Sequence, residues 1–393
     1  MHAKEARYVL VGGGSGGHIT PLVAVAEEIR KHQPYVHIAH IGHKDDPLNK
    51  VTTKAQSISA VYEVSAGKFR RYYGDSHFAR LLDWKSNLLN FRDLFRFIAG
   101  IVQSWFLLGK LKPEIIFMKG GYVCASVGIA ARLRRIPYVT HDSDAMVSLA
   151  HKIIASGATK HLVAMPPKYY PTYDSSKTVQ VGVPISASFA PASGSAKAKV
   201  KKELKLPIAA KVVLITGGGL GAKVINDAVT KSVDKLLADK NVYIVHLTGG
   251  KLYEEVTKQY SRLSDAKRSR IITESFTSIM HKYTAAADII ITRASATALT
   301  EFAAQQKACI VVPSPKLAGG HQLKNAEQLE LANAALVVHE ANIDEELIYK
   351  TVKLLGDEKR RASLGNLLHT TLIVNAAERV YDQLCANEES SKS

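Results

Sequence analysis

The residue best placed to do chemistry is His18, which follows a glycine-rich turn at residues 12–17. An apolar run at 8–11 precedes the turn and a helical pattern follows it, so the glycines join a strand to a helix. Glycine lets a ligand approach the backbone closely, and the amides of a helix start favour an anion such as phosphate. The pattern is neither a phosphate loop nor a good dinucleotide fingerprint, because Asp45 and Asp46, the nearest acidic residues at ribose-binding spacing, lie in a polar turn. A tight turn without chemistry is the alternative.

Two more polar groups follow predicted strands in the first half. His141, Asp142 and Asp144 lie at or just past the end of the strand predicted at 138–141, at the edge where open α/β sheets bind ligands. A second glycine turn, at 119–128, carries an aromatic residue after its two central glycines. The alternative for the acidic residues is helix capping, because Asp and Ser cap helices well.

The second half repeats the order strand, glycine turn, helix at 211–216, 217–222 and 224–237. Residues 293–301 follow a further strand and open a helix, whose free amides would suit a diphosphate. Glu301, about two turns in, could accept hydrogen bonds from a pair of ribose hydroxyls. An ordinary solvated glutamate is the alternative.

Composition favours two globular domains. The chain has 393 residues, of which 46% are hydrophobic, enough for substantial cores. Its three cysteines, Cys124, Cys309 and Cys385, lie far apart and indicate a reduced, cytoplasmic setting, and we expect no bound metal. The N-terminus shows no signal peptide.

The basic charge is concentrated in the first half. Residues 1–200 carry 26 Lys and Arg against 13 Asp and Glu (+13), and the remaining residues carry 26 against 22 (+4). Such a field suits nucleic acid, anionic lipid or a phosphorylated substrate. No nucleic-acid recognition signature accompanies it, so we expect no nucleic-acid partner.

Aromatic, leucine and basic residues interleave through 69–111, which contains both tryptophans. For 69–92 this pattern predicts contact with a membrane surface, because an apolar face can enter the headgroup region while cations face anionic lipid. For 94–111 a core helix followed by a solvated basic face is the favoured prediction. The longest apolar stretch, 97–108, is broken by two polar residues and is too short to span a bilayer.

The predicted fold is α/β with a parallel, doubly wound sheet in each half. We predict an N-terminal domain at 1–188, a second domain at 203–375, and a helix end and frayed tail at 376–393. Residues 190–202 are small, polar and basic, as in a linker or exposed loop. The remaining strands are predicted at 36–41, 61–64, 115–118, 242–247, 271–273, 289–292 and 310–312.

Seven ordered motifs across nearly the whole chain resemble those of the MurG family of glycosyltransferases. They are GGGSGGHITP at 12–21, GGYV at 120–123, His141 with its acidic neighbours, GGGLGA at 217–222, Glu274 to Phe276, RASATALTE at 293–301, and His321-Gln322 to Asn325-Ala326. The family makes lipid II by transferring N-acetylglucosamine (GlcNAc) from UDP-GlcNAc to lipid I.

The resemblance implies a GT-B fold, which consists of two Rossmann-like domains with an interdomain cleft and a C-terminal helix that returns to the first domain. It also implies a peripheral enzyme on the cytoplasmic face of the cell membrane, with UDP-GlcNAc and lipid I as substrates. An anionic membrane surface and cell-wall synthesis proteins are the expected partners. No cofactor is implied.

The resemblance also assigns the site residues. The donor residues are Phe276 at the uracil, Arg293, Ala296 and Thr297 near the diphosphate, Glu301 at the ribose and Gln322 at the sugar, with Gly218, Gly219 and Asp144 also on the donor side. The acceptor residues are Ser15, Gly16, Gly17, Tyr122 and His141. The reaction inverts the anomeric carbon and needs a base at the acceptor hydroxyl. His18 is the leading candidate for that base, and Asp142 is the rival.

Four departures from the family pattern affect the expected donor. Where the family commonly has His-Glu-Gln-Asn, this chain has the residues His141-Asp142-Ser143-Asp144. Asp144 therefore replaces an asparagine that faces the donor. His151 replaces a later asparagine of the same helix. Ser186 replaces an arginine near the diphosphate, and His321 replaces the first of two glutamines. The alternatives are a related GT-B transferase with another UDP-sugar or lipid acceptor, and a catalytically silent lipid I-binding scaffold. A GT-B nucleotide-sugar epimerase is less favoured, because it has no use for a membrane patch.

Overall fold

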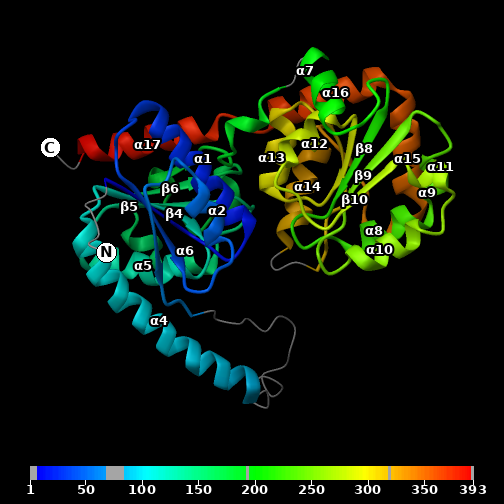
Figure 1. Ribbon diagram of the computed structural model, residues 1–393. Helices are drawn as coiled ribbons and strands as arrows, with labels where there is room; N and C mark the ends of the chain where they lie inside the picture. Colours follow the sequence, from blue (N-terminus) through cyan, green and yellow to red (C-terminus); the bar gives the residue numbers. More distant parts are fainter. Residues whose placement is uncertain (1–6, 68–83, 192–193, 317–319, 391–393) are drawn as a thin grey trace. The chain divides into compact units, whose positions relative to one another are not determined.

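The computed structural model describes residues 7–67, 84–191, 194–316 and 320–390, with the side chains of 84–89 and 387–390 left aside (Figure 1). The chain forms two compact units. One contains residues up to Ser186 together with those from Asn375 onward, and the other runs from Ala187 to Val374. Each unit is built around one parallel sheet with helices on its faces, so the predicted pair of Rossmann-like folds is confirmed.

The first unit holds a seven-stranded parallel sheet in the order β3-β2-β1-β4-β5-β6-β7. Its strands are β1 (Tyr8–Gly12), β2 (Ile38–His43), β3 (Ala60–Val64), β4 (Ile115–Gly120), β5 (Tyr138–Asp142), β6 (Lys160–Val163) and β7 (Thr178–Gln180). Every residue of β1, β4 and β5 is buried, as expected for central parallel strands covered on both faces. The sequence analysis missed β6 and β7, which are short and interrupted by polar residues.

Helices of the first unit include one from the far end of the chain. They are α1 (Gly16–His32), α2 (Asn49–Lys54), α4 (Trp84–Leu111), α5 (Val123–Leu133), α6 (Leu149–Ile154) and α17 (Ala376–Ser390). Helix α17 packs along α1, and its Val380 and Leu384 are fully buried in the core of this unit (Figure 1). The C-terminal helix therefore returns to the first unit, as predicted.

Helix α4 presents an apolar face to solvent. Its inner face packs on α5 and buries Leu108 and Leu111. The exposed large side chains recur at helical spacing and are Phe91, Leu94, Phe95, Ile98, Val102, Trp105 and Phe106. We call these seven residues the α4 apolar face. The predicted solvated basic face for 94–111 is thus wrong, because the outward positions are mostly apolar.

The helix is also longer than its most apolar stretch suggested. Residues Asn90–Leu111 have the length and composition of a membrane-crossing helix, although the shorter stretch at 97–108 does not. Residues 69–83 of the predicted membrane segment lie outside the described residues, so their part of the prediction is not described by the structure.

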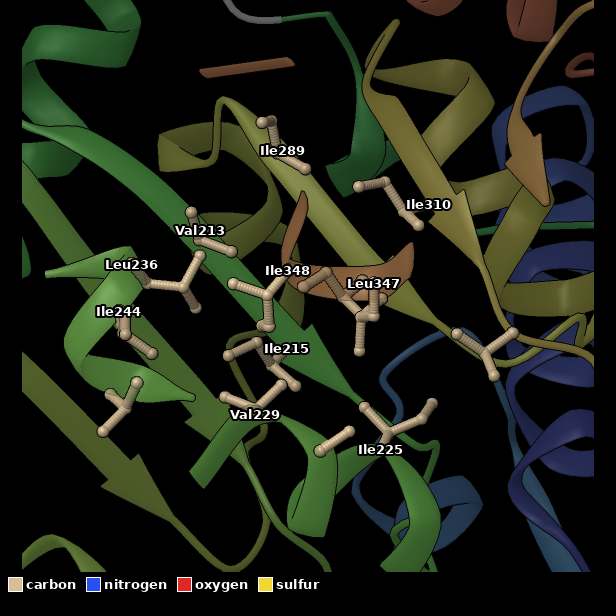
Figure 2. Close-up of a cluster of buried hydrophobic side chains, with 14 of the residues drawn as sticks. Val213, Ile215, Ile225, Val229, Leu236, Ile244, Ile289, Ile310, Leu347 and Ile348 are labelled. Carbon is tan, nitrogen blue, oxygen red and sulfur yellow. The ribbon is translucent and has the colours of Figure 1, made fainter. Parts of the chain in front are cut away.

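The second unit holds a six-stranded parallel sheet in the order β10-β9-β8-β11-β12-β13. Its strands are β8 (Lys211–Thr216), β9 (Val242–Leu247), β10 (Ile271–Glu274), β11 (Ile289–Thr292), β12 (Ala308–Val311) and β13 (Leu336–Val337). Val213, Ile215 and Ile289 point from one face of this sheet into a buried aliphatic cluster, where Leu347 and Ile348 meet them (Figure 2). Burying each such side chain contributes about 1.5–3 kcal/mol, which fixes the sheet and therefore the loops at its edge.

Ten helices of the second unit are described. They are α7 (Gly194–Glu203), α8 (Lys223–Lys231), α9 (Val233–Leu236), α10 (Tyr253–Tyr260), α11 (Asp265–Arg268), α12 (Met280–Ala286), α13 (Ala296–Ala304), α14 (His321–Leu331), α15 (Ile343–Gly356) and α16 (Glu358–Thr371). Helix α7 occupies most of the predicted linker. Its buried Lys201 donates to the carbonyl of Ala210, and its Lys197 pairs with Asp288 at 2.6 Å, so the lysines are structural.

Both units bury neutral histidines. His40 in β2 contacts the carbonyl of Gly12 and the hydroxyl of Thr52. His246 in β9 contacts Tyr260 and Asn226. Burial lowers the pKa of His40 to about 4 and that of His246 to about 3, because the charged imidazolium would lose its hydration.

We expect both units to lose stability as the pH falls from 7 to 5. At pH 5 the unfolded chain protonates these histidines, whose unfolded pKa is 6.5, whereas the folded chain does not. Linkage then costs on the order of 2 kcal/mol per buried histidine. Thermal midpoints measured across this range test the prediction. His246→Gln should flatten the pH dependence of the second unit and His339→Gln, at an exposed site, should not. A flat wild-type midpoint would contradict it.

Candidate active site

The site residues predicted from sequence form two sets, one at the carboxyl edge of each sheet. In the first unit, strand order reverses between β1 and β4, whose following loops carry the glycine turn and Tyr122. In the second unit it reverses between β8 and β11, whose loops carry Gly217–Ala222 and Arg293–Ser295. Open α/β sheets bind ligands outside such switch points.

The glycine turn at 12–17 is shaped by close backbone contacts. Gly14 adopts φ +81°, a left-handed conformation that favours glycine. Ser15 precedes α1 as its N-cap, and its carbonyl accepts the backbone N–H groups of His18 and Ile19. Gly16 and Gly17 begin the helix, so their amides lie among the donors that a helix start leaves without helical partners. The turn can therefore hold an anion.

His18 has a defined tautomer and a lowered pKa. Its Nδ1 lies 2.9 Å from the carbonyl oxygen of Gly13, which accepts, so Nδ1 carries the proton and Nε2 keeps a lone pair. Burial, the ammonium of Lys119 and the imidazolium of His151 lower the pKa of His18 to about 4, opposing the Gly13 hydrogen bond and Asp144. A neutral imidazole with a free Nε2 can accept a proton at neutral pH.

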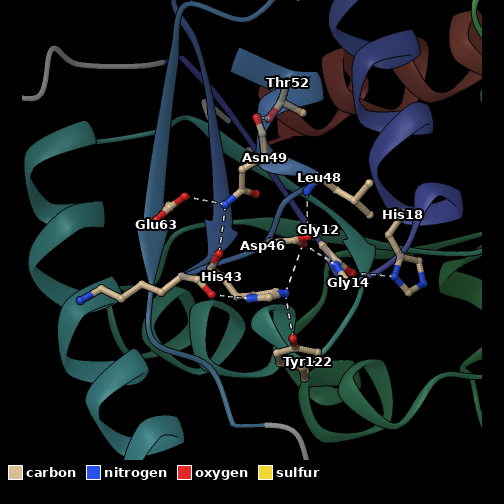
Figure 3. Close-up of polar contacts among 12 residues, drawn as sticks. Gly12, Gly14, His18, His43, Asp46, Leu48, Asn49, Thr52, Glu63 and Tyr122 are labelled. Atoms are coloured by element: carbon tan, nitrogen blue, oxygen red, sulfur yellow. Dashed lines mark hydrogen bonds and ion pairs between the residues drawn. The ribbon is translucent and has the colours of Figure 1, made fainter. Parts of the chain in front are cut away.

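The turn is also tied to residues that the sequence analysis placed only in a polar turn. The backbone N–H of Gly14 donates to Asp46 Oδ2 at 2.7 Å, and the same oxygen lies 3.2 Å from His43 Nε2 (Figure 3). The Tyr122 hydroxyl lies 2.7 Å from that nitrogen. Neither the residue types nor their spacing in the sequence indicates these contacts, because they join loops that meet only in the folded protein.

Asp142 is fully engaged by its neighbours. Its carboxylate pairs with His151 at 2.9 Å and accepts hydrogen bonds from the Tyr173 hydroxyl and the Ser148 amide. Burial opposes ionisation, but these partners hold the pKa of Asp142 well below its usual range. Burial likewise opposes a charge on His151, and the Asp142 carboxylate outweighs it, raising the pKa of His151 to about 9. Such a buried ion pair is a poor proton acceptor.

His141, Asp144 and the strand residue Lys119 complete the first set. His141 is fully buried and its Nε2 contacts the carbonyl of Gly182 at 2.7 Å. The backbone oxygen of Asp144 accepts from Tyr170, and its side chain is partly exposed. Lys119, which the sequence analysis did not select, is 2% exposed and donates to Ser143 at 2.8 Å. Burial lowers the pKa of Lys119 to about 8 against the pull of Asp142 and Asp144.

The second set surrounds the start of α13. Ala296 and Thr297 occupy its first positions, where backbone amides suit an anion. Glu301 lies further along the same helix and is only partly exposed, and no described residue hydrogen-bonds its carboxylate. Burial raises the pKa of Glu301 to about 8, because its charge has no compensating partner. Gly218 and Gly219 in the β8 loop have open space where a Cβ would stand.

The other predicted donor residues differ in how far their side chains are free to contact a ligand. Arg293 pairs with Glu340 at 2.6 Å and donates to the carbonyl of Val312, so its guanidinium already has partners. Gln322 is buried and its Oε1 accepts from the Ser314 amide at 3.0 Å. The ring of Phe276 is 69% exposed and therefore available for contact with a planar ligand. Among the described residues no cluster of three or more His, Cys, Asp or Glu side chains could hold a metal ion.

Comparisons with known proteins match both units. The glycosyltransferase family 28 N-terminal domain matches residues 8–163 and the family 28 C-terminal domain matches residues 212–371. The UDP-N-acetylglucosamine–N-acetylmuramyl-(pentapeptide) pyrophosphoryl-undecaprenol N-acetylglucosamine transferase of Salinibacter ruber is 32% identical, covering 97% of this chain and 96% of its own. The same-named protein of Clostridium perfringens is 31% identical over 96% of this chain and 98% of its own.

Solved structures agree on the fold. The crystal structure of Acinetobacter baumannii MurG has a TM-score of 0.68 at 21% identity and covers 98% of this chain and 99% of its own. A UDP-GlcNAc 2-epimerase from Neisseria meningitidis has a TM-score of 0.65 at 15% identity, covering 96% and 99%. At these identities the likeness concerns the fold alone, which transferases and epimerases share.

We expect the Lys119→Met variant to raise the pKa of His18 from about 4 toward the ordinary value of 6.5. The ammonium of Lys119 disfavours the imidazolium, so its removal lets His18 bind a proton at higher pH. The pH titration of the His18 ring by nuclear magnetic resonance (NMR) measures this directly. Lys110→Met, at an exposed position, is the matched control. An unchanged His18 titration in Lys119→Met would contradict the assigned electrostatics.

Proposed function

Because this chain belongs to glycosyltransferase family 28, we propose that it transfers GlcNAc from UDP-GlcNAc to the C4 hydroxyl of the N-acetylmuramyl sugar of lipid I, giving lipid II. The observation that carries this function is the match to named transferases of the same activity over 96–97% of the chain. The chain is a glycosyltransferase, and its substrates are UDP-GlcNAc and lipid I.

The second unit binds the nucleotide sugar in this proposal. The amides of Ala296 and Thr297 face the diphosphate, and Glu301 accepts hydrogen bonds from the ribose hydroxyls. Support comes from the Glu301 carboxylate, to which no described residue donates a hydrogen bond. Burying that charge costs free energy until a ligand supplies donors. Phe276 covers the uracil, and Gln322 reaches the sugar through its amide nitrogen.

The first unit supplies the base. His18 Nε2 takes the proton of the acceptor hydroxyl as that oxygen attacks the anomeric carbon from the face opposite UDP. A pKa of about 4 guarantees the neutral form but makes a weak base. The diphosphate of lipid I brings negative charge to the glycine turn and so raises the pKa of His18 when the acceptor is bound. Asp142 is not the base, because His151 and Tyr173 occupy its carboxylate.

The assay that tests the reaction is UDP release with a lipid I analogue and UDP-GlcNAc. We expect His18→Ala to lower kcat by about 10²–10⁴-fold, the usual loss for a general base. Glu301→Ala should chiefly raise KM for the donor, because the ribose contact is made before the transition state. His339→Ala and Glu330→Ala, at exposed positions, should match the wild type.

Reactions with other UDP-sugars test whether the four departures from the family pattern change the donor that the enzyme uses. Parallel reactions with other UDP-sugars should release little UDP. Release confined to another sugar would replace the proposed donor, and tight binding of the lipid I analogue without turnover by any donor would indicate a scaffold.

We further propose that the enzyme lies peripherally on the cytoplasmic face of the cell membrane through the α4 apolar face. Phe91, Phe95 and Phe106 are each at least 59% exposed, a large apolar area for a soluble surface. Arg92 and Arg96, both exposed, place cations on the same helix for anionic headgroups. Because the inner side of α4 packs on α5, the helix binds the bilayer along its length rather than crossing it.

We expect Phe95→Ser combined with Phe106→Ser to weaken binding to vesicles containing anionic phospholipid by about tenfold or more, given the apolar area removed from the interface. Vesicle co-sedimentation measures the affinity. The two side chains are solvent-exposed, so the thermal midpoint should hold. The Leu331→Ser variant removes an even more exposed apolar side chain (77%) from the second unit and should bind like the wild type. Equal binding by the double variant would overturn the proposal.

A further inference from the structure

One peptide group in the glycine turn is held at both of its ends. The peptide between Gly13 and Gly14 donates its N–H to Asp46 Oδ2 at 2.7 Å and presents its C=O to His18 Nδ1 at 2.9 Å (Figure 3). A peptide group is planar, so orienting its N–H also orients its C=O. Asp46 therefore acts on the His18 ring through this peptide without touching it.

The orientation of this peptide decides the tautomer of His18. With the carbonyl toward Nδ1, that nitrogen must carry the proton and Nε2 is left to accept one. If the peptide turned over, its N–H would face the ring, Nδ1 would become the acceptor and Nε2 would carry the proton. Such a flip is easy between two glycines, because both left- and right-handed conformations are open to them. Something must therefore hold it.

The Asp46 carboxylate is held in place by hydrogen bonds and by burial. It is 6% exposed, and its second oxygen accepts the Leu48 amide at 3.0 Å. His43 lies 3.2 Å from Oδ2 and also contacts the Tyr122 hydroxyl. These contacts join the loops after β2, β1 and β4, which are neighbours in the sheet. The carboxylate is thus held by its own loop and by His43 as well as by the glycine turn.

We propose that Asp46 is a positioning residue that holds the Gly13–Gly14 peptide in the orientation that keeps His18 Nε2 free to accept a proton. The proposal rests on His18 being the base of the proposed transferase. It assigns the carboxylate a role in the reaction without contact with either substrate. It also removes the Gly14 amide from the donors available to a bound phosphate, leaving those at the start of α1.

The neighbouring residue Asp45 provides a matched control. Asp45 is exposed and adopts φ +64°, which asparagine tolerates, so Asp45→Asn makes the same charge change beside the site. The test variants are Asp46→Ala and Asp46→Leu, whose side chain branches at the same carbon as aspartate and guards against misfolding of the first. Neither side chain offers an acceptor to the Gly14 amide. Thermal midpoints report whether each variant is folded.

The deciding measurement is the tautomer of His18, read from the nitrogen-15 NMR shifts of its two ring nitrogens at neutral pH. We expect the wild type and Asp45→Asn to show one tautomer with the proton on Nδ1, and the folded Asp46 variants to show a mixture. In the lipid I assay, kcat of the Asp46 variants should fall at least tenfold while KM for UDP-GlcNAc stays within about twofold, because only transition-state stabilisation is lost.

Several results would overturn the proposal. One is an unchanged His18 tautomer in a folded Asp46 variant, whatever its activity. Another is equal behaviour of the Asp45 and Asp46 variants. If the wild type itself shows no turnover with lipid I, the proposed function fails, and the tautomer measurement still decides whether Asp46 orients the peptide.

Discussion

The site in the first unit depends on a close approach between the backbone turns after β1 and β4. A Cβ on Gly121 would lie 2.5 Å from the Gly13 carbonyl oxygen, and one on Gly120 would lie 3.0 Å from the His18 ring. Glycine is therefore required at both positions at the end of β4, and both residues adopt positive φ. This contact brings the Gly13–Gly14 peptide beside His18 and Tyr122, and the hydrogen bond to Asp46 then holds the peptide carbonyl toward the imidazole.

The local sequence predicts most of the strands, helices and turns of this arrangement, but few of the hydrogen bonds and ion pairs between them. The alternation of apolar runs and glycine turns predicts both sheets, because parallel strands buried on two faces are nearly continuous in hydrophobicity. Ordered motifs place the glycine turn and His18 just after one strand, and Glu301 in a helix that follows another strand. Contacts such as Gly14 with Asp46 join residues 32 apart along the chain. Contacts between residues so far apart produce no periodic pattern in the sequence. From the sequence, Asp46 is therefore predicted only as a turn residue.

The buried charges of the first unit balance one another. The imidazolium of His151 pairs with the Asp142 carboxylate at 2.9 Å. Breaking such a pair leaves an uncompensated buried charge and typically costs 3–5 kcal/mol. Lys119 lies in the same region and donates to Ser143. Neither the pairing of Asp142 with His151 nor the contact from Lys119 follows from residue type or spacing.

Helix α17 has a consequence for how the protein is made. Its Val380 and Leu384 fill the core of the first unit, yet they leave the ribosome after the whole second unit. Domains generally fold in the order of their synthesis, but here the first core stays incomplete until the whole second unit has been made. The second unit, whose residues are contiguous, can close before the first is complete. The apolar residues of α1 that share a core with Val380 and Leu384 must meanwhile be kept from other chains in the cell.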